Sequence, residues 1–355
     1  IYITYMLTKE SNEFIKELKS KMKYKDLLKS THLKKLFHKL EASRFDYDKP
    51  DIVHRVGNYP CNQFMVKRLY NKSLKYRNIS SLKWLLKSKY SINISLNIYS
   101  LDEREVSEDK VNLLVYALSF ICSLSNRNRD MTIHLVFLGD KKKYTGKFTK
   151  SEINTAGCKF NDVEAEICVW RMEECIKVLF HECIHALRFS SIKDSKEIVD
   201  KYNRLYNNTS DKMLIDEAYT EIWAKVLNCY FVAKISSFNE EDLDLYKYFC
   251  ILLGIEREFT LLQGYKVGND LKKGIKKDIN KDTNVVSYYI ATAEIFNNFE
   301  NFLQFCFRDG QPFYLKDGRL FNSFLLGCKD IPVKRLNTKN KSYKTMRMTA
   351  IELKV

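Results

Sequence analysis

The sequence predicts a mostly helical α+β protein in which a small mixed sheet packs on one buried helix. Only 11 glycines and 4 prolines occur in 355 residues, which favours long helices over many short strands joined by tight turns. Apolar residues recur at helical spacing through much of the chain, whereas shorter stretches in its middle alternate between polar and apolar. With 45% hydrophobic residues, the chain can bury a sizeable core.

The N-terminal region, residues 1–90, is predicted to be basic and helical. Residues 8–45 carry lysines beside leucines and phenylalanines at helical spacing. Two prolines and a glycine mark a loop at 48–60, and helix is expected again at 62–90. We expect these helices to cover the main body; an arm that binds nucleic acid is the alternative.

The predicted core, residues 91–230, begins with strands. Residues 91–100 alternate strictly between polar and apolar, as a half-buried strand does, and 109–124 form a buried helix too short to span a bilayer. Further strands are expected at 131–138, 153–158 and 164–170. Two helices complete the core, with a short inserted helix and loop between them. No membrane span is therefore predicted.

Residues 231–330 are predicted to form a helical C-terminal subdomain, with helix to about residue 307 and turns after it. Residues 331–355 form a basic tail, rich in lysine and asparagine in its first part. No internal repeat is visible.

The net charge and the cysteines indicate which partners and which cellular compartment to expect. A formal net charge of +16 predicts a basic, solvated surface, and weak, non-specific association with nucleic acid is the alternative, because no nucleic-acid reading motif accompanies the charge. The ten cysteines include no C-x-x-C pair, so we expect free thiols in a core rather than a disulfide framework. The beginning of the sequence shows no secretory signal. A cytoplasmic, non-secreted protein is the expectation.

A metal site is predicted on the helix that contains residues 181–185, His-Glu-Cys-Ile-His. His181 and His185 are four positions apart, so both imidazoles project from one helical face and can hold one ion, with Glu182 beside them. The surrounding residues are apolar at helical spacing, which predicts burial. Unpaired polar groups there would each cost about a few kcal/mol, and a bound ion removes that cost.

The next helix offers a third ligand, because Glu217 and Glu221 share one of its faces. Ser210 or Asp211 is the expected N-cap of this helix. Two imidazoles and a carboxylate suit zinc, one ion per chain. No histidine follows His185, which excludes a third histidine ligand of the metzincin kind.

These residues resemble the gluzincins, the thermolysin-like clan of zinc peptidases, whose second helix carries an Asn-Glu-x-x-Ser-Asp pattern. The resemblance implies a zincin-like core, with Glu217 as third ligand. Thr220 and Glu221 then take the places of the serine and of the carboxylate that orients the first histidine. Asp216 replaces the asparagine, Glu221 is longer than the aspartate of the family, and the gap after His185 is long. Either Glu217 or Glu221 can therefore be the ligand.

Residues 131–230 also resemble the predicted metallopeptidases encoded by large cytoplasmic DNA viruses. The resemblance rests on Asn154 and Gly157 before the metal helix, on the Arg-Met-Glu-Glu segment at 171–174, and on the two metal-site helices. It implies a viral protein in the host cytoplasm or the virion. Asn154 and Gly157 would line the substrate cleft, with a bulge or turn as the alternative role for this segment.

The function implied is a zinc-dependent peptidase that acts on peptide or protein substrates, with Glu182 as general base. A donor to the developing oxyanion is also needed, and the candidates are Tyr288, Tyr289 and Tyr219. The alternative is a catalytically inactive zinc-binding structural or virion-associated protein with a basic, nucleic-acid-facing surface. Retention of Glu182 favours the peptidase, because a structural site has no use for a general base.

Overall fold

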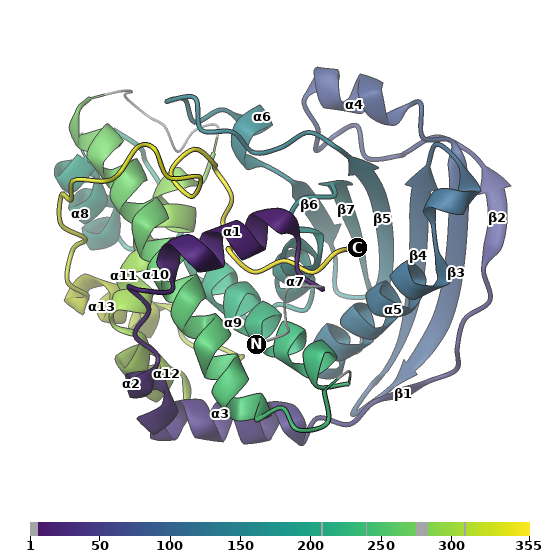
Figure 1. The fold of residues 1–355 in the computed structure, drawn as a ribbon, viewed down its shortest axis with the longest axis horizontal. Coiled ribbons are helices and arrows are strands. Elements are labelled where there is room, and N and C mark those ends of the chain that lie inside the picture. Colours follow the sequence, from purple (N-terminus) through teal and green to yellow (C-terminus); the bar gives the residue numbers. More distant parts are fainter. Residues whose placement is uncertain (1–5, 207–208, 239, 275–282, 309) are drawn as a thin grey trace. The chain divides into compact units, whose positions relative to one another are not determined.

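The structure is a computed structural model that describes residues 6–206, 209–238, 240–274, 283–308 and 310–355. It is an α+β fold with a mixed sheet, as predicted (Figure 1). The chain divides into a helical unit (Ile1–Glu41, Lys142–Ile153 and Phe189–Lys354) and a sheet unit (Ala42–Lys141 and Asn154–Arg188). The predicted boundaries at residues 90, 230 and 330 are therefore wrong, because the chain alternates between the two units.

The sheet unit is built on seven strands, more than the small sheet expected. In chain order its elements are β1 (Asp46–Tyr47), β2 (Val53–Val56), α4 (Lys67–Ser73), β3 (Asn78–Lys87), β4 (Ser91–Ser100), a 3-10 turn (Glu103–Glu105), α5 (Glu108–Ser123), β5 (Asp130–Leu138), β6 (Ala156–Phe160), β7 (Glu164–Arg171) and α7 (Cys175–Ala186). The strand order is β1-β3-β4-β5-β7-β6, and β2 also pairs with β3. The β4–β5 and β5–β7 pairs are parallel and the others antiparallel. Strands β4, β5 and β7 and helix α5 lie where the sequence predicts them.

The helix predicted over residues 62–90 is wrong. Only α4 is helical there, and β3 supplies a ten-residue strand. In β3 the side chains of Leu82, Trp84 and Leu86 are buried while Lys83, Leu85 and Lys87 between them are exposed. This period of two matches a strand with one covered face. Strand β6 also begins later than predicted, at Ala156, because residues 150–153 form the short helix α6.

Helices α5 and α7 pack against each other and cover one face of the sheet (Figure 1). The Trp84 indole of β3 donates a hydrogen bond of 3.1 Å to the Ser119 hydroxyl of α5. Phe120 of α5 lies 5.8 Å from Phe180 of α7, measured between ring centroids. α7 also packs on β6 and β7. The apolar positions of α7 predicted to be buried therefore fix its rotation against the sheet.

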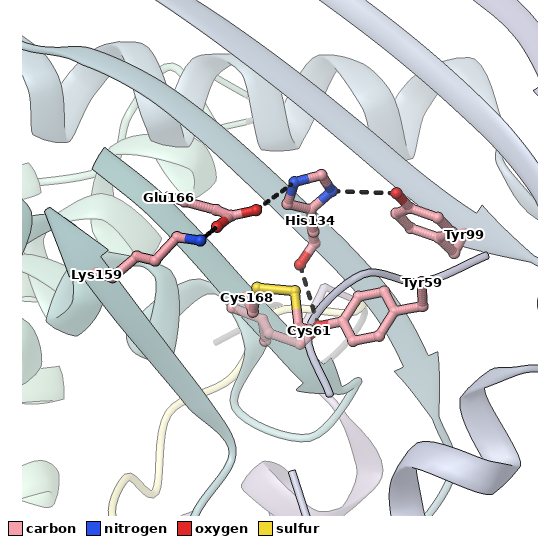
Figure 2. Close-up of a disulfide and its surroundings, with 8 residues drawn as sticks. Tyr59, Cys61, Tyr99, His134, Lys159, Glu166 and Cys168 are labelled. Carbon is pink, nitrogen blue, oxygen red and sulfur yellow. Dashed lines mark hydrogen bonds and ion pairs between the residues drawn. A yellow bond between two sulfur atoms is a disulfide. The ribbon is translucent and has the colours of Figure 1, made fainter. Parts of the chain in front are cut away.

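The opposite face is covered by the segment 57–66, which a disulfide between Cys61 and Cys168 ties to β7 (Figure 2). The Tyr59 hydroxyl of this segment donates to the Val169 carbonyl at 3.0 Å. The expectation of free thiols is therefore wrong for these two cysteines, while the eight others carry free thiols within the described chain. The two partners are 107 residues apart, so only the packing of the segment on the sheet brings them together.

Beside the disulfide, the His134 side chain is held at both ring nitrogens (Figure 2). Nδ1 lies 3.1 Å from the Tyr99 hydroxyl and Nε2 lies 3.3 Å from a Glu166 carboxylate oxygen. Burial lowers the pKa of His134 below its ordinary value. This histidine is thus fixed as part of the sheet.

The helical unit contains three N-terminal helices and a C-terminal bundle. Its elements are α1 (Lys9–Leu18), α2 (Lys25–Lys29), α3 (Thr31–Glu41), α6 (Lys150–Ile153), α8 (Lys196–Tyr206), α9 (Asp216–Ser237), α10 (Leu245–Lys272), a π-helix (Val286–Ala291), α11 (Thr292–Asn297), α12 (Phe299–Cys306) and α13 (Gly318–Gly327). α9 and α10 pack side by side, and α1 and α2 lie on α10. These N-terminal helices therefore cover part of the helical bundle, as the sequence predicts.

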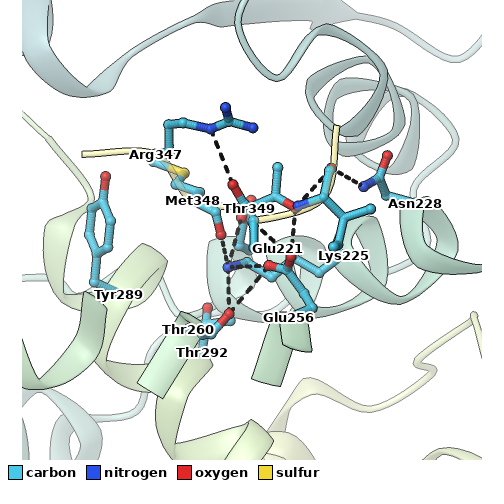
Figure 3. Close-up of polar contacts among 12 residues, drawn as sticks. Glu221, Lys225, Asn228, Glu256, Thr260, Tyr289, Thr292, Arg347, Met348 and Thr349 are labelled. Carbon is cyan, nitrogen blue, oxygen red and sulfur yellow. Dashed lines mark hydrogen bonds and ion pairs between the residues drawn. The ribbon is translucent and has the colours of Figure 1, made fainter. Parts of the chain in front are cut away.

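The C-terminal residues are not a basic tail throughout, and this part of the prediction is wrong. Met346, Ala350 and Ile351 are fully buried against α9 and α10. Buried side chains of these helices hold the backbone of the segment (Figure 3). Glu256 of α10 accepts from the Ala350 amide at 2.9 Å, and Asn228 of α9 donates to the Ile351 carbonyl at 2.8 Å. The segment is therefore part of the core of the helical unit.

A buried carboxyl in the helical unit makes its stability depend on pH. Glu294 of α11 accepts from Tyr202 at 2.8 Å and pairs with Lys201 at 3.2 Å, and burial raises its pKa to about 7. Between its ordinary value of 4.5 and about 7, the folded state holds a proton that the unfolded state releases. The contribution of Glu294 to stability should therefore fall by roughly 3 kcal/mol as pH rises through this window.

Urea unfolding at pH 5 and pH 8 measures this effect. Glu294→Gln should remove this contribution from the difference between the two pH values, whereas Glu197→Gln, at an exposed carboxyl on α8, should leave the difference unchanged. An equal pH dependence in the wild type and the Glu294 variant would contradict the assignment.

Candidate metal centre

Helix α7 carries the two histidines and begins directly after the sheet. Glu174, which precedes it, has a left-handed backbone (φ 65°) and turns the chain from β7 into the helix. Arg188, just after the helix, is also left-handed (φ 50°), and its amide donates to the His185 carbonyl at 2.9 Å. Both ends of α7 are thus fixed by sharp turns, and the helix is almost completely buried between them.

The imidazoles of His181 and His185 lie side by side on one face of α7. Their ring centroids are 4.9 Å apart with the planes at 74°. The residue exposure of His181 is 6% and that of Glu182 is 8%, and His185 is half-buried. Two neutral imidazoles in this arrangement can supply two corners of a tetrahedral metal site. The Glu182 carboxylate, buried next to them, is suited to accept a proton.

Helix α9 places Glu217 in its first turn, where the side chain is half-buried. The Asn284 amide, which the sequence analysis did not single out, donates to Oε1 of Glu217 at 3.0 Å. One residue earlier, Oδ1 of Asp216 accepts from the Ser190 hydroxyl at 2.6 Å and from the Ile192 amide at 3.0 Å. Each carboxylate at the start of α9 therefore has a defined partner within the helical unit.

The turn that leads into α9 is held by Asp194, which sequence reasoning did not single out. Neither Ser210 nor Asp211 caps the helix, whose N-cap position is Ile215. Asp194, from the segment between α7 and α8, accepts hydrogen bonds from the backbone amides of Met213, Leu214 and Ile215 at 2.6, 2.7 and 2.9 Å. The Asp194 carboxylate thus satisfies the backbone amides of the turn that precedes Asp216, the first helical residue. No local sequence signal marks a partner that lies 19 to 21 residues away.

We expect Asp194→Ala to destabilise the helical unit by about 1.5–3 kcal/mol, because three amides lose a charged acceptor. The free energy of unfolding in urea measures this loss. Asp211→Ala, at the predicted but unused cap, is the matched control and should change stability by less than about 0.5 kcal/mol. Equal losses in the two variants would contradict the role of Asp194 in holding this turn.

Glu221 and Thr220, the residues implied to orient the first histidine, lie one turn further along α9. Both are fully buried. Oε1 of Glu221 lies 3.7 Å from Nζ of Lys225 on the same helix (Figure 3). Glu217 therefore lies at the half-buried end of α9, whereas Glu221 takes part in a buried ion pair. This contrast favours Glu217 as the ligand, and the orienting role of Glu221 and Thr220 stays a prediction.

The three candidate tyrosines differ in their surroundings. The Tyr219 hydroxyl donates to the Pro312 and Phe313 carbonyls, both at 3.3 Å, and the Tyr289 hydroxyl donates to the Met346 carbonyl at 2.7 Å. Both rings are buried, as expected of core tyrosines. Tyr288 is half-buried, and its hydroxyl lies 3.5 Å from the Asn284 amide nitrogen. Of the three, Tyr288 best suits a role toward substrate.

The two residues predicted to line a substrate cleft lie at the edge of the sheet. Asn154 is half-buried and precedes β6, while Gly157 is within β6, the last strand in the order. A Cβ atom on Gly157 would lie 2.6 Å from the Phe64 ring. The glycine thus makes room for Phe64 on that face.

No helix of the described residues is both long enough and apolar enough to cross a membrane. Comparison with protein-family models, curated proteins and solved structures finds no match to this chain.

Proposed function

We propose that this protein is a zinc-dependent peptidase, with His181, His185 and Glu217 as metal ligands and Glu182 as general base. The observation that carries the proposal is the pair of adjacent imidazoles on α7, with a buried carboxylate next to them on the same helix. Polar side chains on a buried helix are costly unless they interact, and a bound metal ion is a partner that suits two imidazoles beside a carboxylate.

The donor set suits zinc. Each of the three residues offers one ligand atom, an imidazole nitrogen or a carboxylate oxygen. Three protein ligands leave the fourth position of a tetrahedral zinc open for water, as catalytic rather than structural sites require. Glu182 is needed only if that water reacts.

The residues of this chain then have distinct tasks. When bound between these residues, zinc would supply a water of lowered pKa and a charge that polarises the scissile carbonyl. Glu182 accepts a proton from the attacking water and delivers it to the leaving amine. The Tyr288 hydroxyl donates a hydrogen bond to the oxygen on which charge develops.

The edge strand β6 is the proposed docking strand for a peptide. β6 packs beside α7, and the described sheet ends at β6. An extended peptide can pair with such an edge through backbone hydrogen bonds. The residues of β6 are half-buried or exposed along its whole length. This arrangement fits peptide or protein substrates.

Metal removal tests the proposal. Cleavage of a mixed peptide library should stop when a chelator strips the protein and should return when zinc is added back. A protein that binds zinc and cleaves nothing would favour the inactive, structural alternative. Cleavage that is unaffected by stripping would contradict a zinc peptidase.

A further inference from the structure

We propose that Asn284 is a positioning residue that holds the Glu217 carboxylate in place for the metal ion. The inference rests on the proposed function, because it assigns a role to Asn284 through the metal ligand. It does not follow from any motif in the sequence, since residue 284 is 67 positions from Glu217.

One amide contacts both functional groups. Nδ2 of Asn284 lies 3.0 Å from Oε1 of Glu217 and 3.5 Å from the Tyr288 hydroxyl. The bond to Oε1 restricts rotation of the carboxylate about its last side-chain bond. Because the amide is uncharged, it does this without cancelling the negative charge that attracts the ion.

The backbone around Asn284 is itself fixed to the segment that precedes Glu217. The Ser287 hydroxyl donates to the Met213 carbonyl at 2.6 Å, and the Met213 amide donates to Asp194. The backbone carbonyl of Asn284 accepts a hydrogen bond of 2.9 Å from the Tyr288 amide, and the π-helix Val286–Ala291 begins two residues after Asn284. Such π-helical turns are rare in proteins as a whole, but those that occur are often found at functional sites. Glu217, Asn284 and Tyr288 are thus held by one hydrogen-bonded framework within the helical unit.

Asn284→Ala should weaken zinc binding by about 10–100-fold, the usual loss when a group that orients a ligand is removed. Competition with a chromophoric chelator measures the zinc Kd without any use of activity. Asn284→Leu, which keeps a side chain of similar size and removes the donor, should give a similar loss. The matched control is Asn269→Ala, because the Asn269 amide donates to the Lys334 carbonyl instead of to a ligand.

Thermal unfolding of the zinc-free proteins establishes that the variants are folded. If wild type binds zinc and either folded Asn284 variant binds it equally well, the role of Asn284 is overturned while the proposed function stands. If wild type binds no zinc, the proposed function fails and this inference fails with it. A loss in both Asn284 variants, with Asn269→Ala unchanged, supports the inference.

Discussion

Glu182→Gln should lower kcat/KM for peptide cleavage by about 10²–10⁴-fold while the protein keeps its zinc. The amide has nearly the shape of the carboxylate but cannot accept the proton of the attacking water. Glu182 is not among the proposed ligands, so the metal content should not change. Peptide cleavage and zinc content are measured on the same preparation.

The matched control is Glu103→Gln, at an exposed carboxylate of the sheet unit, which should cleave as the wild type does. Equal turnover of wild type and Glu182→Gln would contradict the role of Glu182 as base. Loss of zinc in Glu182→Gln would show that this residue acts through the metal instead.

Lys225→Met should destabilise the helical unit by about 3–5 kcal/mol, because it leaves buried carboxylates without their cation. Nζ of Lys225 lies 3.4 Å from Glu256 and 3.7 Å from Glu221, and it also donates to Thr260 at 2.8 Å and to the Met348 carbonyl (Figure 3). The side chains of Lys225, Glu221 and Glu256 are at most 1% exposed. The free energy of unfolding in urea measures the loss.

The same helix supplies a control for this prediction. Lys234 of α9 pairs with Glu41 at 2.9 Å, but both side chains are more than a quarter exposed. Lys234→Met should therefore cost about 0–1 kcal/mol. Adding Glu221→Gln and Glu256→Gln to Lys225→Met should recover part of the loss, since the uncompensated charges are then gone. Similar costs at Lys225 and Lys234 would contradict a buried ion network.

Local periodicity was enough to predict several elements of the fold. The strict alternation of 91–100 and the apolar run of 109–124 became β4 and α5 within a residue or so. The helix of His181 and His185 is likewise local, because helical spacing alone places both imidazoles on one face. In each of these elements, the contacts that determine the secondary structure join residues close together in the sequence.

Long-range contacts explain what the sequence could not reveal. The sequence predicts helix at β3 because its lysines and leucines suit either state, and pairing with β4 decides the outcome. The residues after 341 look like a polar tail until α9 and α10 supply partners for their backbone. Asp194, Asn284 and the Cys61–Cys168 disulfide act across 19 to 107 residues, so no local signal marks them.

The most direct test of the metal centre is the zinc content of purified wild type and of His181→Ala and Glu217→Ala, measured by elemental analysis against protein concentration. We predict about one zinc per chain in the wild type and a large loss in both variants, because each removes one of the three proposed ligands. A wild type without zinc, or variants that retain it in full, would contradict the site.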